Sequence, residues 1–546
     1  MRKQAILAQA AVVFFLAICI RPAYCSQKDK IKQNPLLCSS QAYLSAGQRK
    51  SLYGKSSQQL SRTFAHYIRG ILYDSEGQVD QAIKEYLAAR ALDAQTPAIH
   101  KRLAVDYIKT GQYQQAEQEL VALKKIEPGD RDVRIILANF YTAQKQFDAA
   151  IREYEELLPL NPHDLEVLSS LADLYVIQEQ FSQAVDVYKK ILQERPDSAQ
   201  VHFNLGIIYT RTEEIEQAQN HFNQALKIDP KYLQAELALA LLNEINQNLS
   251  QAIQHYKKAL KIDPLNINVY HRLAQTYYRD NRVKDAIHQY EFILNLSPYD
   301  IDAYLELAYI YLQQKESQLC IQTLEEAKKG KTNWRFSLEG SFLSVEKTQE
   351  LKNLKQAQLC LILGLAYTQN DQEDLAIQAY EEAIEANPQA ALAYFYLGAL
   401  YERKGWREKS YQALKKSVQL DAENPDALNY LGYMYAEDGI NIDRAQELII
   451  KALNADPDNG AYLDSLGWVY FKKGMVEEAL AQVQRAAQLL EDAEIFEHLG
   501  DIYRVQNDIE NAEAAYQRAL SLEPQRASII EKLEQLKGEK ITNVAR

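Results

Sequence analysis

The chain has 546 residues, of which 61 are Lys or Arg and 74 are Asp or Glu, so its formal net charge is −13. Apolar residues make up 47% and charged residues 25%, which excludes a disordered polyelectrolyte and a protein with many membrane spans. The acidic balance argues against a general nucleic-acid binder. Five cysteines in so long a chain do not form a disulfide framework, and 36 Tyr against 19 Gly indicate a loop-poor, repeated architecture.

Residues 1–25 have the organisation of a secretory signal. Two basic residues precede an apolar run from Ala5 to Ile20, and a short polar stretch follows it. The run is shorter than the roughly 20 residues that span a bilayer, so a retained signal anchor is the less favoured alternative. Cleavage either follows Cys25 or precedes it, in which case the Cys25 thiol is acylated. We therefore predict an exported protein, periplasmic or outer-membrane-associated in a bacterium.

A 34-residue pattern begins at Thr63 and recurs nearly to the end of the chain. Position 8 of every copy is Gly or Ala, position 11 is Tyr in twelve copies, and position 20 is Ala in eleven. Apolar residues recur at helical spacing on both sides of a polar turn, so each copy is predicted to be a helical hairpin. The thirteen copies start at Thr63, Pro97, Arg131, Leu165, Ala199, Leu233, Ile267, Ile301, Ala357, Ala391, Pro425, Gly460 and Ala493.

A single hairpin of this length buries only part of its apolar face, so neighbouring hairpins must stack. We predict an all-α, right-handed superhelical solenoid of about thirteen hairpins. The insertion after repeat eight carries Trp334, Phe336 and Phe342, which either lie over the working surface or, as we favour, patch the end of repeat eight. The predicted parts are a signal peptide at 1–25, a tether at 26–62, repeats at 63–329, an insertion at 330–356, repeats at 357–526, and a capping helix with a tail at 527–546.

The small residue at position 8, Tyr at 11, Ala at 20, an aromatic residue at 24 and Pro at 32 resemble the tetratricopeptide repeat family. The resemblance covers residues 63–526 and implies that the first helices line a concave groove that binds peptides or proteins. In the family, positions 2, 5, 9, 12 and 13 of each first helix face this groove, and we call the surface that they form the groove face.

The groove face is predicted to be apolar from repeat five to repeat twelve. Exposed apolar strips favour recognition of a partner, and packing within the array is the alternative. The apolar candidates are Phe203, Ile207, Leu237, Leu241, Leu305, Tyr309, Leu361, Leu365, Phe395, Tyr433, Trp468 and Phe471.

Two basic clusters stand out on the groove face of this acidic chain. They either receive an acidic segment or a terminal carboxylate, or pair with neighbouring Glu and Asp residues. The basic candidates are Lys101, Arg102 and Lys109 in repeat two, and His271, Arg272 and Arg279 in repeat seven.

No spacing typical of a catalytic, nucleotide-binding or metal site occurs in the chain. We therefore predict a protein that is not an enzyme and needs no cofactor or metal. Cys320 and Cys360 fall on interior positions of the repeat and are predicted to be buried, inert thiols, with a disulfide between them as the weaker alternative.

A narrower resemblance covers residues 427–474. The run from Asn459 to Trp468 is similar to exported bacterial repeat proteins, among them the outer-membrane lipoprotein adaptor of a carboxy-terminal processing protease. We therefore expect a non-catalytic interaction scaffold of the cell envelope that binds envelope proteins, with the protease-adaptor role as its sharpest form. The alternative is a component of polysaccharide or pilus export machinery. A membrane is expected to be involved only through a lipid anchor or an uncleaved signal.

Overall fold

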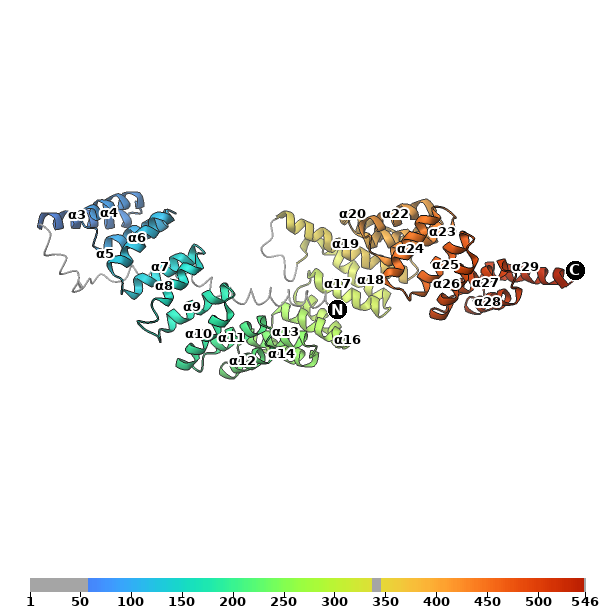
Figure 1. The fold of residues 1–546 in the computed structure, drawn as a ribbon, viewed down its shortest axis with the longest axis horizontal. Helices are drawn as coiled ribbons and strands as arrows, with labels where there is room; N and C mark the ends of the chain where they lie inside the picture. The colour runs from blue at the N-terminus through green and yellow to red at the C-terminus, as the bar shows by residue number, and fades with distance from the viewer. Residues whose placement is uncertain (1–56, 336–344, 545–546) are drawn as a thin grey trace. The chain divides into compact units, whose positions relative to one another are not determined.

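The computed structural model describes residues 57–335 and 345–544. The predicted signal peptide, Cys25, most of the predicted tether, Phe336 and Phe342 lie outside these residues. The chain divides into two compact units, residues 1–281 and 282–546, and each is described by itself (Figure 1). Apart from the short 3₁₀ helix η2 (Lys331–Asn333), the regular elements of the described residues are α-helices.

The N-terminal unit contains antiparallel helix pairs that follow one another along the chain. Their bounds are α3 (Ser57–Ser75), α4 (Val79–Leu92), α5 (Pro97–Lys109), α6 (Tyr113–Ile126), α7 (Arg131–Ala143), α8 (Phe147–Glu155), α9 (Leu165–Ile177), α10 (Phe181–Glu194), α11 (Ala199–Arg211), α12 (Ile215–Ile228), α13 (Leu233–Ile245), α14 (Leu249–Ile262) and α15 (Ile267–Arg279).

The C-terminal unit continues the same pattern. Its bounds are α16 (Val283–Leu296), α17 (Ile301–Gln313), α18 (Ser317–Lys329), α19 (Val345–Gln369), α20 (Glu373–Ala386), α21 (Ala391–Arg403), α22 (Arg407–Leu420), α23 (Pro425–Glu437), α24 (Ile442–Ala455), α25 (Gly460–Lys472), α26 (Val476–Leu489), α27 (Ala493–Val505), α28 (Ile509–Leu522) and α29 (Ala527–Val544).

Eleven of the thirteen predicted repeat starts are the first residue of a helix. The other two repeats begin with longer helices: α3 starts at Ser57, inside the predicted tether, and α19 starts at Val345, inside the predicted insertion. Both extensions contain neither Gly nor Pro, and the second is rich in Glu, Lys, Gln and Leu, which favour the helix. The predicted all-α repeat solenoid is confirmed.

In most repeats the side chain just before the first helix caps its N-terminus. Asp164 accepts hydrogen bonds from the backbone N–H groups of Glu166 (3.2 Å) and Val167 (3.3 Å). Asn459 does the same for Ala461 (3.1 Å) and Tyr462 (3.3 Å). These caps satisfy N–H groups that have no partner within the helix, so a short polar side chain at this position starts the helix.

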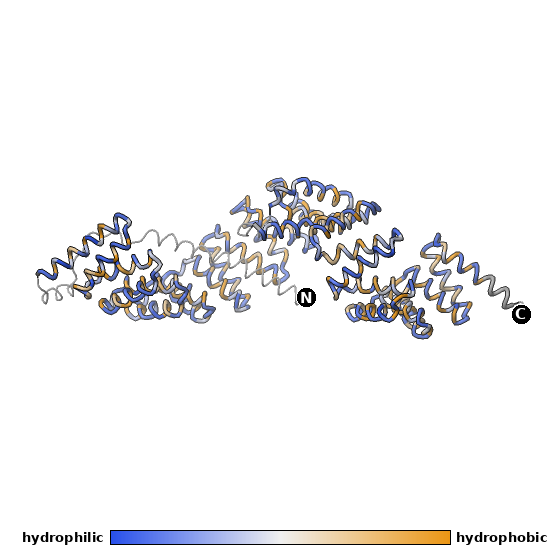
Figure 2. Tube along the Cα trace, turned by 90° about the horizontal axis from the view of Figure 1, so that it is seen from above, coloured by the Kyte–Doolittle hydropathy of each residue, from blue (hydrophilic) through white to orange (hydrophobic). Residues whose placement is uncertain are grey.

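The small residue at position 8 lets the two helices of a hairpin touch. A Cβ built on Gly364 would lie 2.3 Å from a ring carbon of Tyr380, and one on Gly206 would lie 2.5 Å from a ring carbon of Phe222. The large ring therefore occupies the space that a side chain at position 8 would fill. Along each helix hydrophobic residues are interleaved with hydrophilic ones, as Figure 2 shows, and the hydrophobic ones form the core between helices.

The packing of the C-terminal unit continues past the insertion. Helix α19 packs against both α17 and α18, and one hydrophobic cluster contains Cys320 from repeat eight together with Cys360 from repeat nine. Trp334 belongs to the same cluster and is only 6% exposed. The first part of the insertion therefore closes the end of repeat eight, as the favoured alternative for Trp334 predicts.

Candidate functional site

The apolar groove-face residues of repeats five to eight are mostly buried, which corrects their assignment to an exposed binding strip. Phe203 is the best example, because its ring lies 5.7 Å from that of Phe222 and 5.2 Å from that of Tyr232. Tyr309 is the exception and is 44% exposed. The residues that are at most 7% exposed are Phe203, Ile207, Leu237, Leu241 and Leu305. Large neighbouring side chains cover these positions, so here packing within the array is the alternative that holds.

The six candidates of repeats nine to twelve keep part of their surface exposed. All six are half-buried, so their side chains pack against the array on one side and meet solvent on the other. They come from four successive first helices, α19, α21, α23 and α25, and are Leu361, Leu365, Phe395, Tyr433, Trp468 and Phe471. This stretch is the accessible part of the predicted strip, and we call it the late groove face.

Trp468 is at the centre of an aromatic stack on the late groove face. Its ring stacks on Phe471, with centroids 4.9 Å apart, and on His498 of the next repeat, with centroids 4.0 Å apart. The Lys472 ammonium lies 5.0 Å from the Trp468 ring centroid. Because Trp468 joins two repeats, its replacement would remove packing as well as a contact surface.

His498 is held by an acidic partner from the neighbouring first helix. Its Nδ1 lies 2.9 Å from one carboxylate oxygen of Asp464, and both side chains are buried. Burial lowers the pKa of His498, but the Asp464 carboxylate outweighs burial, so the pKa of His498 is raised above its ordinary value. The pair therefore stabilises the stack beneath Trp468 when the imidazole is protonated.

Two buried polar atoms of the late groove face lack a hydrogen-bond partner among the described residues. They are Oδ1 of Asn429, an acceptor, and Nε1 of Trp468, a donor. Asn429 occupies position 5 of repeat eleven, and Trp468 occupies position 9 of repeat twelve. Close by, the Tyr433 hydroxyl donates a hydrogen bond to Glu494. An unpaired buried polar group is costly, so these two atoms are a local departure from the otherwise paired packing of the repeats.

The basic cluster of repeat two is neutralised within the array. Lys109 Nζ lies 2.8 Å from carboxylate oxygens of both Asp74 and Asp106, and Arg102 lies 3.6 Å from Asp74. Lys101 is 3.7 Å from Glu127. Burial lowers the pKa of Lys109, but its bonds to the two aspartates outweigh burial and raise it.

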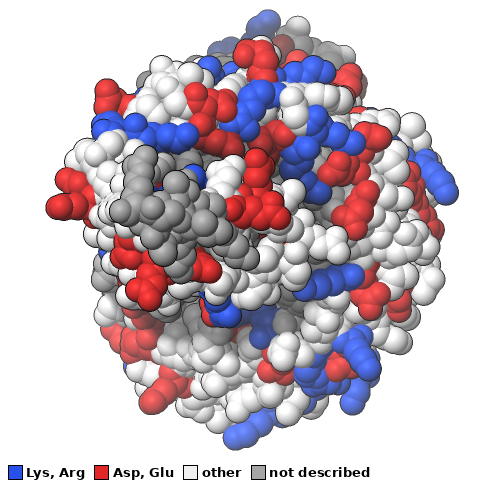
Figure 3. Space-filling view, turned by 90° about the vertical axis from the view of Figure 1, so that its right-hand side faces the viewer, with Lys and Arg blue, Asp and Glu red and all other residues white. Residues whose placement is uncertain are grey.

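The basic cluster of repeat seven is also paired. Arg272 and Arg279 each lie 3.7 Å from a carboxylate oxygen of Glu244, and His271 is 5% exposed. Pairing with neighbouring acids is thus the alternative that describes the Lys and Arg residues of both clusters, whereas His271 is buried. Figure 3 shows the same tendency on one face of the molecule, where acidic and basic side chains are intermingled.

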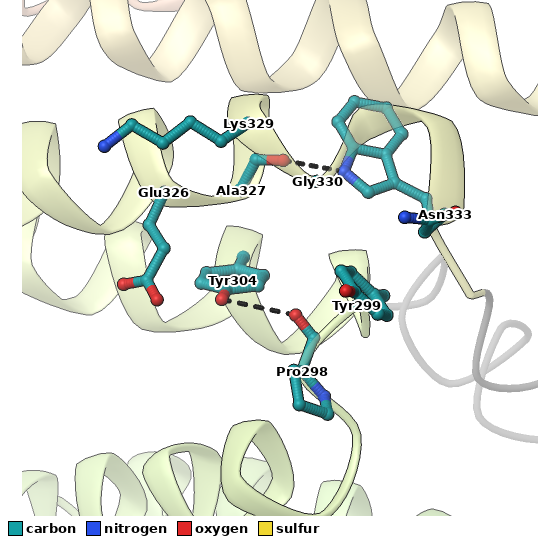
Figure 4. A pocket seen from close by; sticks show the side chains of 9 residues that line it. Pro298, Tyr299, Tyr304, Glu326, Ala327, Lys329, Gly330 and Asn333 are labelled. Carbon is teal, nitrogen blue, oxygen red and sulfur yellow. Dashed lines mark hydrogen bonds between the residues drawn. The ribbon is translucent and has the colours of Figure 1, made fainter.

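A pocket of about 360 Å³ lies at the end of repeat eight (Figure 4). Its wall includes Tyr299, Glu326 and Lys329. Trp334 Nε1 donates to the carbonyl oxygen of Ala327 (2.9 Å), so the indole nitrogen is already paired. The Trp334 ring therefore packs in the core at the end of repeat eight.

The described residues offer few chemically reactive groups. Cys320 and Cys360 are both buried and free, and burial raises the pKa of each thiol to about 12, which suppresses the reactive thiolate. Among the described residues no group of three or more His, Cys, Asp or Glu side chains is arranged to hold a metal ion. None of the helices in the described ranges has the length and apolar character of a membrane span.

Sequence reasoning missed the polar part of the late groove face. Asn429 and Asp464 stand at position 5 of their repeats, and Glu494 at position 2, so the position rule itself could have found them. His498 stands at position 6, which faces the preceding repeat, and only the structure shows that its ring supports Trp468.

Comparison with known proteins supports the repeat assignment. Models described as tetratricopeptide repeat match residues 75–140, 141–202, 175–242, 271–332 and 391–424. A TPR repeat model matches 245–281 and 364–405, and a tetratricopeptide repeat-like domain model matches 462–543.

Individual relatives are distant. The TPR repeat-containing protein PA4667 of Pseudomonas aeruginosa is 26% identical over 144 residues, which is 26% of this chain and 24% of that protein. The match thus spans about a quarter of the relative's length.

Two solved structures are similar over most of this chain. The Cut9–Hcn1 hetero-tetramer of the APC/C gives 16% identity, covers 87% of this chain and 96% of that chain, and has a TM-score of 0.38. Yeast Tom70 is 15% identical, the match covers 88% of this chain and 97% of that chain, and the TM-score is 0.32.

The family models together cover most of the residues between 75 and 543. The chain therefore belongs to the tetratricopeptide repeat family, whose arrays are protein–protein interaction scaffolds and are generally non-catalytic.

Proposed function

We propose that this chain is a non-catalytic scaffold of the bacterial cell envelope that holds a partner protein, or an extended segment of one, on the late groove face. The observation that carries the proposal is the difference in burial along the groove face. The apolar residues of repeats five to eight are largely enclosed, whereas those of repeats nine to twelve remain half-exposed. Half-exposed aromatic side chains on rigid helices are the usual anchors of a protein interface.

An extended segment also suits the unpaired polar atoms of the late groove face. A polypeptide backbone offers a C=O acceptor for Nε1 of Trp468 and an N–H donor for Oδ1 of Asn429. Both atoms are shielded from water in the free chain, so a bound segment pairs them only where the Asn429 and Trp468 side chains rotate towards it, and this pairing would recover the free-energy cost of their burial.

The envelope location is supported by the signal-like organisation of residues 1–25. The resemblance of residues 427–474 to exported bacterial repeat proteins supports the same location, and the sharpest form of the proposed function is an adaptor for an envelope protease. A role in polysaccharide or pilus export remains the alternative, and the identity of the captured partner distinguishes the two.

Asn429→Leu tests the segment-binding part of the proposal. The replacement removes an unpaired buried acceptor and keeps a side chain of similar size, so we expect thermal stability to be unchanged or slightly higher. Capture of an envelope partner should be weaker than with the wild-type chain. Asn204→Leu in repeat five is the comparison variant: the Asn204 amide donates to the Tyr188 hydroxyl (3.0 Å), so this variant should lose stability without losing the partner. Undiminished capture by Asn429→Leu would contradict the proposal.

A further inference from the structure

The groove face of the late repeats differs from that of the middle repeats in charge as well as in burial. In repeats five to eight, two acidic residues stand against two Lys or Arg, namely Glu244 and Asp302 against Arg211 and Arg279. In repeats nine to thirteen, seven acidic residues stand against three, namely Glu402, Asp426, Glu437, Asp464, Glu494, Glu497 and Asp501 against Arg403, Lys472 and Arg504. The stretch whose apolar residues remain accessible is therefore also acidic.

Part of this acidic charge is neutralised inside the array. Arg407 lies 3.0 Å from Glu402 and 2.5 Å from Glu437. Lys532 of α29 lies 2.7 Å and 2.6 Å from two carboxylates of repeat thirteen. The buried carboxylate beside His498 is paired with that imidazole. These contacts leave the charge of two groove-face carboxylates unanswered.

Asp426 and Glu494 form no ion pair with a Lys or Arg of the described residues. Asp426 is exposed and accepts a hydrogen bond from the Tyr462 hydroxyl. Glu494 is half-buried and accepts one from the Tyr433 hydroxyl. Arg526 is close enough to interact electrostatically with Glu494, but its ion pairs are with two other carboxylates. A hydroxyl leaves the negative charge in place, and a carboxylate has further lone pairs that can accept from a cation.

The two carboxylates lie on either side of the aromatic side chains of the late groove face. The hydrogen bond from Tyr433 to Glu494 joins repeat eleven to repeat thirteen across 61 residues of sequence. Helix α25, which carries Trp468, packs against both α23 and α27. Asp426 lies on the same face of α23 as Asn429 and Tyr433, because these residues are three or four apart in sequence. Negative charge thus borders the half-exposed rings on both sides.

This combination of charge and apolar surface restricts the occupant. An acidic segment, or the late groove face of a second copy, would bring like charges together, which is unfavourable. A small cation alone would leave the half-exposed apolar side chains uncovered. A segment that carries both Lys or Arg and apolar residues answers both features, because its cations pair with the carboxylates while its apolar side chains cover the rings.

We propose that the segment held on the late groove face is basic, with Lys or Arg side chains at Asp426 and Glu494 and apolar side chains between them on Tyr433 and Trp468. The inference rests on the proposed function, because it names the chemistry of the segment that this face holds. It reverses the sequence-based expectation for the groove, in which the basic clusters of repeats two and seven receive an acidic segment.

Selection from a displayed library of random peptides tests the sign of the charge. Peptides of about 12 residues span roughly 40 Å when extended, which is enough to cross several repeats. The bait is residues 26–546, and the double variant Phe395→Ser, Phe471→Ser removes peptides that bind elsewhere, at a temperature at which both proteins are folded. We expect the remaining peptides to have more Lys and Arg, relative to Asp and Glu, than the unselected library.

The outcomes of the selection separate the inference from the proposed function. Peptides that depend on Phe395 and Phe471 but show an acidic excess, or no excess of either sign, would overturn the inference and leave the proposed function in place. If no selected peptide depended on these two residues, the proposed function and the inference would both be contradicted.

The double variant Asp426→Asn, Glu494→Gln tests the two carboxylates with one selected peptide. The amide oxygens can still accept from the Tyr462 and Tyr433 hydroxyls, so the melting temperature should stay near the wild-type value. Fluorescence anisotropy at low salt should show binding that is about three- to tenfold weaker, since two exposed ion pairs are lost. The difference should shrink at high salt, where such pairs are screened.

The matched control is Glu385→Gln, Glu478→Gln. It removes the same number of charges from exposed positions on the second helices α20 and α26 and should bind the peptide like the wild type. Equal binding by the wild type and the Asp426, Glu494 variant at low salt would overturn the inference. An equal loss in the control variant would assign the effect to the net charge of the chain and would overturn it as well.

Discussion

Phe203 in repeat five and Phe395 in repeat ten occupy the same position of the repeat but serve different purposes. Phe203 is 3% exposed and packs between the rings of Phe222 and Tyr232. Phe395 is half-buried and meets the edge of Tyr430 at a centroid distance of 6.0 Å. The position of a residue in the family repeat therefore predicts which face of the helix it occupies. The sizes of the neighbouring side chains decide whether that face is buried in the core or exposed at the surface.

The largest expected effect is the loss of stability in Phe203→Ala. Removing a fully buried Phe leaves a cavity, which costs about 3–5 kcal/mol of unfolding free energy. Urea unfolding followed by circular dichroism measures this loss of unfolding free energy. Hydrogen exchange of peptides from α11 to α13 locates it. A loss below about 1 kcal/mol would show that Phe203 is not a core residue, because core truncations cost more than this.

Gly206→Ala and Gly364→Ala should have equal, intermediate effects. In both repeats the added Cβ would meet a large ring, Phe222 in one and Tyr380 in the other. Overpacking costs about 1–3 kcal/mol, and the better helix propensity of Ala offsets about 0.5–1 kcal/mol of that. Thermal melts of the two variants measure the effect. A cost in only one of them would mean that the two hairpins do not share the same close contact.

Phe395→Ala should destabilise the chain less than Phe203→Ala, by about 1–2 kcal/mol, because a half-buried ring loses less apolar contact. It should weaken partner capture, which Phe203→Ala should leave intact at temperatures where that variant is folded. Equal losses of stability in the two variants, measured in the same urea series, would remove the distinction between core and surface on which the proposed function rests.

The pH response should have opposite signs at two histidine sites. In repeat five, Nδ1 of His202 lies 3.0 Å from Nδ1 of His221, and burial, followed by His202 and Lys189, lowers the pKa of His221 to about 4. The unfolded chain then binds more protons below about pH 6.5, so this site loses stability as the pH falls from about 6.5 towards 4.

In repeat thirteen, the pKa of His498 is raised, so its contribution is present below about pH 6.5 and is lost as the pH rises through the raised value. Hydrogen exchange of α11 and α27 between pH 4 and 8, compared with His221→Gln and His498→Gln, isolates each site. Parallel pH trends at the two sites would contradict the assigned protonation states.

The repeat register was predictable from the sequence because it rests on local rules. The features that set the register act within one hairpin: the small residue at position 8, caps such as Asp164, and the turn residues. The observed helix starts agree with these local features. Pro159 shows the limit of the pattern: α8 ends at Glu155, since a proline removes a backbone donor and disfavours helix before it.

The candidate site was only partly predictable, because exposure on the groove face depends on neighbours from other repeats. Nothing in the local sequence distinguishes Leu237, which is buried, from Leu361, which is half-buried. Likewise, the pairing of Lys109 with Asp74 joins residues 35 positions apart, and only the stacked hairpins bring them together.

The most direct test of the proposed scaffold is affinity capture from envelope extract with residues 26–546, compared with the double variant Phe395→Ser, Phe471→Ser. Both proteins should show the same helical content at the temperature of the capture, although the double variant should melt at a lower temperature because Phe395 and Phe471 are half-buried. We predict that the wild-type chain retains a defined envelope partner, such as a protease or one of its substrates, and that the double variant loses it. Retention of the same partner by both proteins, or of no partner by the wild type, would contradict a scaffold that works through the late groove face.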